Sequence, residues 1–563
     1  MEDVGGSRVS AAVGSSRKLE RLMNQTWRRL PSRASFFVLL VLFGANVIRT
    51  YTLGMDDRPP KWLVEAIPPA LSDLAFGNRD GYTSLNVVND VFYTNLQGKR
   101  DGATVNRAIR EVMALNPHAV SSQTQLLGDE DKGIVDLIKI SFRLFGYSTA
   151  SPLHLYFVLL FLSALTFAVT FNALFCHTVL GGFLVAHYLF LPTVFYHVQL
   201  QSVLALRFLP VLSMIACLHC LLFATRSRFT VLELVALALQ IGLIVFVVHM
   251  RIVTMWQVAI IAVITMLAFA RITYANHSRS ARGTLQRFIP AVIPIIFVLG
   301  GLAGLTAYRS VAYDQRYFRE DQLVTRSFWH NIFSGLAFNP ALAERYQLKV
   351  DDFSIVRAVG RITTENRHAG EWEAIESNTE GLLKLLGTAP ASYDRLAGYA
   401  FLDLCLHREM KQCVATAIYY KPLSLLRHLA WLYGFRRDVP DVAIFVSPEN
   451  NVMEFHLNSL KDSLDKTGLR FRLWDPLAIF MVVSFAIILY TTEDIVRITD
   501  AAAGVVLTAG TVLPSVVGYP SMHTVAEPAI AMAASLYCGV AVLLGRGVGW
   551  QRAYRLLHSI KIQ

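Results

Sequence analysis

Charged residues are scarce in this sequence. Asp, Glu, Lys and Arg make up 17% of the 563 residues, whereas a soluble globular domain usually carries about 25%. Hydrophobic residues account for 54%, and the mean hydropathy is +0.43. This balance excludes an intrinsically disordered or a collagen-like chain. It also makes a soluble globular enzyme the weaker interpretation.

Several sequence signatures of soluble chemistry are missing as well. The chain has no Walker loop, no dinucleotide-binding fingerprint and no recognisable catalytic serine or cysteine arrangement. ATP-driven export by this chain alone is therefore not expected.

Cysteine is rare too, and the 6 cysteines exclude a disulfide-dense miniprotein. Cys405 and Cys413 are eight residues apart, which on one straight helix places them about 12 Å apart, too far to bond. A disulfide between them requires the helix to break near His407 to Glu409.

What the sequence has in abundance is apolar runs that are long enough to cross a bilayer, at about 20 residues per crossing. The first run follows Arg28, Arg29 and Arg33 and has no clean cleavage site after it, so we interpret it as an uncleaved signal anchor. Together the runs predict an all-α polytopic membrane protein with about ten transmembrane helices. The expected spans are 35–50, 153–175, 178–196, 202–224, 229–248, 252–270, 287–308, 475–491, 498–518 and 525–545.

The distribution of basic residues predicts the orientation of these helices. The N-terminal tail is rich in arginine, which places it on the cytoplasmic side of the membrane by the positive-inside rule. The membrane is expected to be the inner, or plasma, membrane. With alternation from there, the turns holding Arg226 and Arg271 and the C-terminal tail with Arg552 are also cytoplasmic. The net charge of +11 is then an orientation signal that faces anionic lipid. Nucleic-acid binding has no other support and is not expected.

Two long loops are extracytoplasmic in this topology, and their basic and acidic residues nearly balance. The second loop is long and well patterned, which favours a folded α-rich domain over a linker. The expected organisation is a cytoplasmic basic tail (1–34), a first transmembrane helix (35–50), a first extracytoplasmic loop (51–151), a six-helix transmembrane region (152–308), an extracytoplasmic α-rich domain (309–474), a three-helix transmembrane region (475–545) and a cytoplasmic basic tail (546–563).

Acidic residues at the start of the first outer loop are candidates for chemistry. Asp56 and Asp57 form an adjacent pair at the membrane surface, and Asp80 follows between two glycines. Such carboxylates could act as a general base or hold a divalent metal through oxygen ligands. The structural alternative is that these aspartates only cap helices or stabilise turns. No residue is assigned as a metal ligand, and no cofactor is certain.

Basic residues lie at several of the expected outer helix ends. Guanidinium groups near the headgroup plane suit a phosphate or diphosphate because they form bidentate, charge-assisted hydrogen bonds. The alternative for each arginine alone is that it extends to the lipid phosphates. The candidate phosphate-binding residues are Arg207, Arg251, Arg309, Arg326 and His330.

In layout, the chain resembles the GT-C superfamily of integral-membrane glycosyltransferases. The resemblance consists of a first span, a long outer loop that opens with Asp56 and Asp57, closely spaced spans, and a large outer domain before the last spans. The segment from Arg326 to Leu336 is also similar to a pattern in uncharacterised bacterial polytopic membrane proteins of this layout.

The resemblance implies that Asp56 or Asp57 deprotonates the acceptor, with Asp80 as a competing base, while the outer arginines grip the donor phosphate. It implies a polyprenyl-phosphate sugar donor and an envelope glycan, lipid or protein as the acceptor. The surrounding membrane lipids are further expected partners of the chain. Two alternatives stay open: a lipid or glycan transporter or flippase, and a non-catalytic component of an envelope assembly. The near-absence of ionisable residues in the middles of the spans ranks transport second.

Overall fold

The computed structural model describes residues 59, 61–76, 85–99, 101–115, 132–152, 154–156, 158–159, 162–163, 166–167, 213–224, 229–250, 254–275, 281–312, 328–349, 352–377, 390–424 and 517–518. Every regular element within these residues is helical, as an all-α fold requires. The helices form two clusters, each around its own hydrophobic core.

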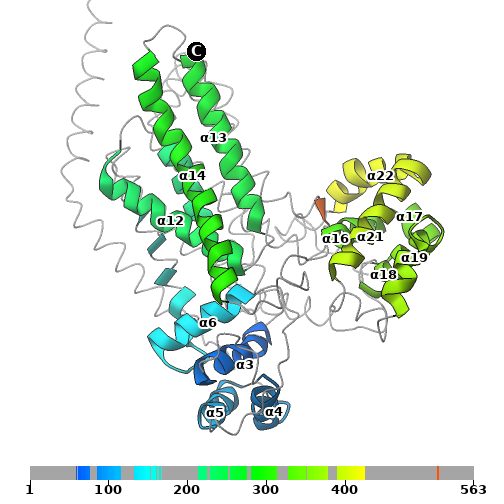
Figure 1. The fold of residues 1–563 in the computed structure, drawn as a ribbon, viewed down its shortest axis with the longest axis horizontal. Helices are drawn as coiled ribbons and strands as arrows, with labels where there is room; N and C mark the ends of the chain where they lie inside the picture. Colours follow the sequence, from blue (N-terminus) through cyan, green and yellow to red (C-terminus); the bar gives the residue numbers. More distant parts are fainter. Residues whose placement is uncertain are drawn as a thin grey trace, which may run out of the picture.

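The first cluster combines helices of the segment 51–151, the expected first outer loop, with the apolar helices. Its elements are α3 (Lys61–Phe76), α4 (Leu85–Leu96), α5 (Gly102–Met113), α6 (Lys132–Phe145), α11 (Met214–Ala224), α12 (Val231–Met250), α13 (Met255–Ala275) and α14 (Ala281–Ala312). One continuous core joins the two groups, because Ile67 of α3 and Phe142 of α6 belong to the same buried cluster as Ile244 of α12. Figure 1 shows α3 to α6 gathered beside the C-terminal end of α14.

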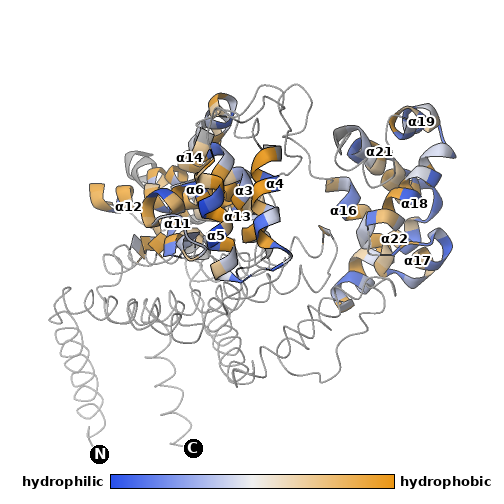
Figure 2. Cartoon of the chain, turned by 90° about the horizontal axis from the view of Figure 1, so that it is seen from below, coloured by the Kyte–Doolittle hydropathy of each residue, from blue (hydrophilic) through white to orange (hydrophobic). Residues whose placement is uncertain are grey.

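Two helices of this cluster are long and apolar enough to cross a membrane, namely Val231–Met250 and Phe288–Ala312. They coincide with the expected spans at 229–248 and 287–308, and the shorter apolar helix Met255–Ala270 coincides with the span at 252–270. Figure 2 shows the cluster that contains these helices coloured largely as hydrophobic. The other expected spans lie wholly or partly outside the described residues, so the number of ten stays a prediction.

Polar side chains inside the apolar helices pair with one another. Gln240 of α12 donates to the carbonyl oxygen of Ser163 and to the hydroxyl of Thr166, both at 2.6 Å. Ser213 donates to Gln257 of α13 at 2.5 Å. Hydrogen bonds of this kind between helices satisfy groups that hydrocarbon would leave without partners.

The start of α12 is fixed by a capping box. The Glu233 carboxylate accepts from the backbone N–H of Thr230 at 2.7 Å, and the Thr230 hydroxyl accepts from the N–H of Glu233 at 3.3 Å. This reciprocal arrangement satisfies donors that a helix leaves open in its first turn. It gives Glu233 a local structural role at the end of the helix that is expected to be cytoplasmic.

The second cluster lies within the segment 309–474, for which the sequence predicts an extracytoplasmic α-rich domain, and we call it the outer domain after that expectation. Its elements are α16 (Phe328–Ser334), η4 (Gly335–Phe338), α17 (Pro340–Tyr346), α18 (Asp352–Thr364), α19 (Ala369–Ser377), α21 (Pro390–Leu402), the π-helical turn η6 (Asp403–Arg408), α22 (Met410–Ala415) and the π-helical turn η7 (Thr416–Tyr420). Phe333, Val359 and Leu396 lie at the centre of its core.

A disulfide joins Cys405 to Cys413 across a break in the outer domain's helices. Glu409, with φ −133° and ψ 35°, ends η6 and precedes α22. The break brings the two Cα atoms to 5.4 Å, which is within the range that a disulfide can bridge. The condition set by the sequence, a helix that breaks near His407 to Glu409, is therefore met.

Candidate functional site

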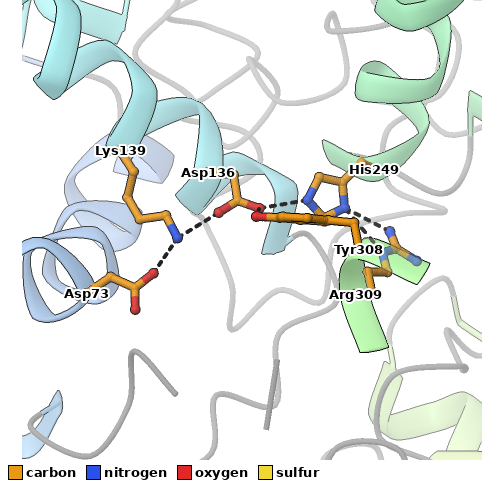
Figure 3. A network of polar contacts seen from close by, with 6 residues as sticks. All are labelled: Asp73, Asp136, Lys139, His249, Tyr308 and Arg309. Carbon is orange, nitrogen blue, oxygen red and sulfur yellow. Dashed lines mark hydrogen bonds and ion pairs between the residues drawn. The ribbon is translucent and has the colours of Figure 1, made fainter. Parts of the chain in front are cut away.

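A chain of charged and polar groups connects four helices at the junction between the first outer loop and the apolar helices (Figure 3). Asp73 comes from α3, Asp136 and Lys139 from α6, and His249 is the penultimate residue of α12. Tyr308 and Arg309 come from the last turns of α14. We call these six residues the rim network, because they lie at the expected outer ends of the spans.

The close approach of α6 to α12 depends on Gly133. A Cβ atom at this position would collide with the carbonyl group of His249 and the backbone nitrogen of Met250. Because glycine has no side chain, the first turn of α6 can lie directly on the last turn of α12. This contact places Asp136, one turn further along α6, opposite the ring of His249.

Asp136 is the centre of the rim network. One of its oxygens lies 2.8 Å from Nε2 of His249 and accepts from the Tyr308 hydroxyl at 3.3 Å. The other oxygen lies 2.8 Å from the ammonium of Lys139. Lys139 also forms an ion pair with Asp73. The side chains of Asp136 and His249 are 8% and 3% exposed, so these contacts are almost fully removed from solvent.

The hydrogen bonds of His249 determine its tautomer. Nε and Nη2 of Arg309 lie 3.2 Å and 3.0 Å from Nδ1 of the ring. A guanidinium only donates hydrogen bonds, so Nδ1 must be the acceptor and the proton must sit on Nε2, facing Asp136. His249 is therefore held as a neutral imidazole between a carboxylate and a guanidinium, and its edge packs against the ring of Tyr308, with the ring centroids 6.0 Å apart.

The charges within the rim network support one another. Burial alone would raise the pKa of Asp136, but its hydrogen bond with His249 and the ammonium of Lys139 hold it below its ordinary value. Burial would likewise lower the pKa of Lys139, and the carboxylates of Asp136 and Asp73 raise it instead. For Asp73, burial outweighs Lys139 and raises the pKa. Two cations and two carboxylates are present, so the network is balanced in formal charge.

This arrangement has three chemical capacities. It ties the first outer loop to two helices of spanning length. It orients the guanidinium of Arg309 through contacts with a neutral ring, which fix its direction without neutralising its charge. It also provides a buried hydrogen bond between Asp136 and His249, along which a proton could be passed. In the described conformation His249 is not a free general base, because Nδ1 already accepts from Arg309.

His330, a candidate phosphate ligand, lies in the core of the outer domain. It is 3% exposed. Its Nδ1 lies 2.7 Å from the Tyr393 hydroxyl and its Nε2 lies 3.2 Å from a carboxylate oxygen of Asp352. The hydrogen bond from His330 lowers the pKa of Asp352. Asp394 caps α16 by accepting from the backbone N–H groups of Trp329 and His330. These contacts give His330 a structural role in this domain.

Of the residues that the sequence singles out, the structure describes Arg309 and His330. The first joins the rim network and the second does not. The remaining candidates lie outside the described residues, and their roles stay predictions: Asp56, Asp57, Asp80, Arg207, Arg251 and Arg326.

Sequence reasoning missed Asp136, Lys139 and His249. Two signals were available. Asp136 and Lys139 are spaced i, i+3 on an amphipathic segment, as an ion pair requires. His249 lies two residues before Arg251, one of the candidate phosphate-binding residues. Neither signal indicates that the two segments meet.

The described residues hold no group of three or more His, Cys, Asp or Glu side chains that could bind a metal ion. Cys217, His219 and Cys220 are buried on α11, and His219 packs edge-on against Phe167, with a distance of 6.4 Å between the ring centroids. A divalent metal at the acids of the first outer loop stays a hypothesis.

No protein-family model matches the chain, and no curated protein or solved structure is significantly similar to it. The resemblance in layout to the GT-C superfamily is therefore a proposal about this chain.

Proposed function

We propose that this chain is a GT-C-like glycosyltransferase of the inner membrane that moves a sugar from a polyprenyl-phosphate donor to an envelope glycan, lipid or protein on the outer face. The observation that carries the proposal is the position of Arg309. It lies near the end of a helix of spanning length and in direct contact with His249, which connects it to helices of the first outer loop. A lipid-linked donor presents its phosphate at this depth of the membrane.

The contacts of Arg309 suit a phosphate ligand. Nε and Nη2 bind the neutral ring of His249, so these contacts leave the positive charge intact. Asp136 fixes the ring from the other side, and the guanidinium is therefore oriented before a donor arrives. A preorganised cation stabilises the charge that develops on a leaving phosphate without reorganising during the reaction.

The acids proposed as the catalytic base flank the helix that enters the rim network. Asp57 precedes α3 by four residues and Asp80 follows it by four, while Asp73 on α3 pairs with Lys139. This continuity supports a base and a phosphate ligand on the same side of the membrane. An inverting transfer needs only one such base on the acceptor side, so Asp56, Asp57 and Asp80 remain alternatives for that role.

The proposal can be tested with the full chain in phosphatidylglycerol-containing nanodiscs. Radiolabelled polyprenyl-phosphate hexoses and pentoses serve as donors, and an extract of envelope lipids and glycans supplies the acceptor. We expect one of the three variants Asp56→Asn, Asp57→Asn and Asp80→Asn to abolish sugar transfer while donor binding persists. Arg309→Lys should weaken donor binding about tenfold or more, because a charge-assisted hydrogen bond contributes about 1.5–3 kcal/mol.

Two exposed residues provide matched controls, Asp90→Asn on α4 and Arg107→Lys on α5. Both should transfer sugar at the unaltered rate. The transferase proposal is wrong if none of the donors is consumed, or if Arg309→Lys and all three acid variants remain fully active.

A second function has one observation in its favour. The hydrogen bond between Asp136 and His249 joins two side chains that can exchange a proton, as a proton-coupled transporter or flippase requires. In that case His249→Gln should abolish proton uptake into proteoliposomes, and sugar transfer should be absent from all variants and from the unaltered chain. A non-catalytic assembly component would show neither activity.

A further inference from the structure

A row of apolar side chains is exposed along α22 and η7 in the outer domain. Met410, Val414 and Ile418 are 60%, 49% and 70% exposed, and Tyr419 beside them is 59% exposed. The first three are spaced four residues apart, so they lie along one face of a continuous helical segment. We call these four residues the α22–η7 face.

The opposite side of the same segment is firmly anchored. Cys413 forms the disulfide with Cys405. Thr416 is buried and lies 3.1 Å from the side-chain amide of Asn339. The exposed face is therefore held in place by covalent and polar contacts from behind. Exposing large apolar side chains on a rigid surface is unfavourable in water and typical of a binding surface.

The charge pattern of this segment favours an anionic surface. From Met410 to Arg437 the sequence contains no aspartate or glutamate. The basic residues of this stretch are Lys411, Lys421, Arg427, Arg436 and Arg437. It also carries tyrosines and a tryptophan, which prefer the boundary between lipid and water. Apolar side chains with neighbouring cations and aromatics are characteristic of helices that lie in a membrane interface.

The position of the segment agrees with this chemistry. The ammonium of Lys421, one residue after η7, donates to the backbone carbonyl of Val517 at 3.1 Å. Gly335 lies so close to the Gly518 carbonyl that a Cβ atom would not fit. Val517 and Gly518 end the apolar run 498–518, at the end that the topology places on the outer side. The C-terminal end of the α22–η7 face thus lies where an expected span leaves the membrane.

We propose that the α22–η7 face docks on the anionic outer leaflet of the same membrane and seats the outer domain there. The proposal rests on the membrane topology and not on sugar transfer, so either can fail alone. The apolar side chains enter the acyl-chain boundary to a depth of about 5–10 Å, and the exposed ammonium of Lys411 remains among the headgroup phosphates.

The unaltered full chain can be tested in nanodiscs that contain a phosphatidylglycerol with a photoactivatable diazirine in its acyl chain. After illumination, mass spectrometry locates the labelled peptides. The peptide Met410–Tyr420 should be labelled several-fold more than the peptide that carries Phe353. Phe353 is an internal control, because it is also exposed and apolar but lies on α18.

Two variants sharpen the test. Ile418→Glu should remove most of the label from this peptide, whereas Ile418→Leu should retain it, and in both the label on α12 should be unchanged. Discs of phosphatidylcholine with the same diazirine chain should give several-fold less label on the peptide than the anionic discs.

The proposal is overturned if the peptide Met410–Tyr420 is labelled no more than the Phe353 peptide, or equally in neutral and anionic discs. The second control is carbene footprinting in lipid-free detergent at increasing protein concentration. The proposal is also overturned if the α22–η7 face becomes protected from labelling there as the protein concentration rises. That result would identify a second copy of the chain as the occupant.

Discussion

Replacing Asp136 by asparagine tests the rim network directly, because the two side chains have nearly the same shape. Asparagine presents one carbonyl oxygen and one amide NH2 group. If the NH2 group faces His249, the ring must accept at Nε2, and its proton then moves to Nδ1 against the donors of Arg309. If the NH2 group faces Lys139, two donors meet. Neither orientation satisfies all of the neighbours.

The structure sets the size of the effect. Either orientation loses one charge-assisted hydrogen bond, which contributes about 1.5–3 kcal/mol. The buried cations also lose one of their two carboxylates, and removing one partner of a buried ion pair costs about 3–5 kcal/mol. Because Asp73 still neutralises Lys139, we expect the lower end of this range, a loss of about 3 kcal/mol in the free energy of unfolding.

The free energy of unfolding can be measured by titrating the full chain from dodecylmaltoside into sodium dodecyl sulfate and following tryptophan fluorescence. The exposed substitution Asp90→Asn is the matched control and should change stability by less than about 0.5 kcal/mol. Because the folded pKa of Asp136 lies below the ordinary value of 3.8, its stabilisation is complete above that value and is lost as the pH falls through the folded pKa. The difference between variant and unaltered chain should therefore be constant above about pH 5.

A double-mutant cycle isolates the tautomer argument. Arg309→Gln supplies a carbonyl oxygen that can accept from a protonated Nδ1 of His249. The double variant Asp136→Asn/Arg309→Gln should therefore lose less stability than the two single variants together, by about 1 kcal/mol or more. If the two effects add to within about 0.5 kcal/mol, the assigned proton position on His249 is refuted.

Two further predictions concern packing and buried charge. Gly133→Ala should destabilise the chain by about 1–3 kcal/mol because the new methyl group collides with the backbone of α12, whereas Gly242→Ala, which meets open space, should be neutral or stabilising in the same detergent titration. Burial lowers the pKa of Lys421 from 10.5 to about 8, so stability should rise with pH between these values, by at most about 3 kcal/mol. Lys421→Met should remove this rise with pH. It should also stabilise the chain at pH 7 by about 2 kcal/mol, because the loss of the hydrogen bond to the Val517 carbonyl costs about 1 kcal/mol of the gain. A variant that is less stable at pH 7 would contradict this prediction.

The candidate site illustrates which kinds of contact could be anticipated. Arg309 was identified because a guanidinium at the end of an apolar run is conspicuous in any sequence. His330 was identified as a basic residue close to Arg326, yet it packs in the outer domain with Tyr393 and Asp352. The sequence shows where both residues lie relative to the expected spans, but it does not show which side chains surround them in the fold.

For the first outer loop, the local sequence predicts helices but not the helices against which they pack. Helices α5 and α6 are amphipathic, and Asp101 caps α5 by accepting from the backbone N–H of Thr104 at 2.9 Å, so local signals for these helices exist. What the local signals omit is the partner of their apolar faces. Helix α5 packs against α3 and α4, whereas α6 packs against α3 and α12, and the shared core makes the loop part of the same folded unit.

The amino-acid sequence by itself determined the helical class and apolar character of the described spans, because hydropathy is summed over neighbouring residues and needs no knowledge of the fold. It also set the condition for the Cys405–Cys413 disulfide, since a helix has a fixed rise per residue. Only the tertiary structure decided that Asp136 meets His249 across 113 residues and that Arg309 meets it across 60. Such contacts depend on how closely two helices pack, here through the missing side chain of Gly133, and no periodicity within either helix encodes that distance.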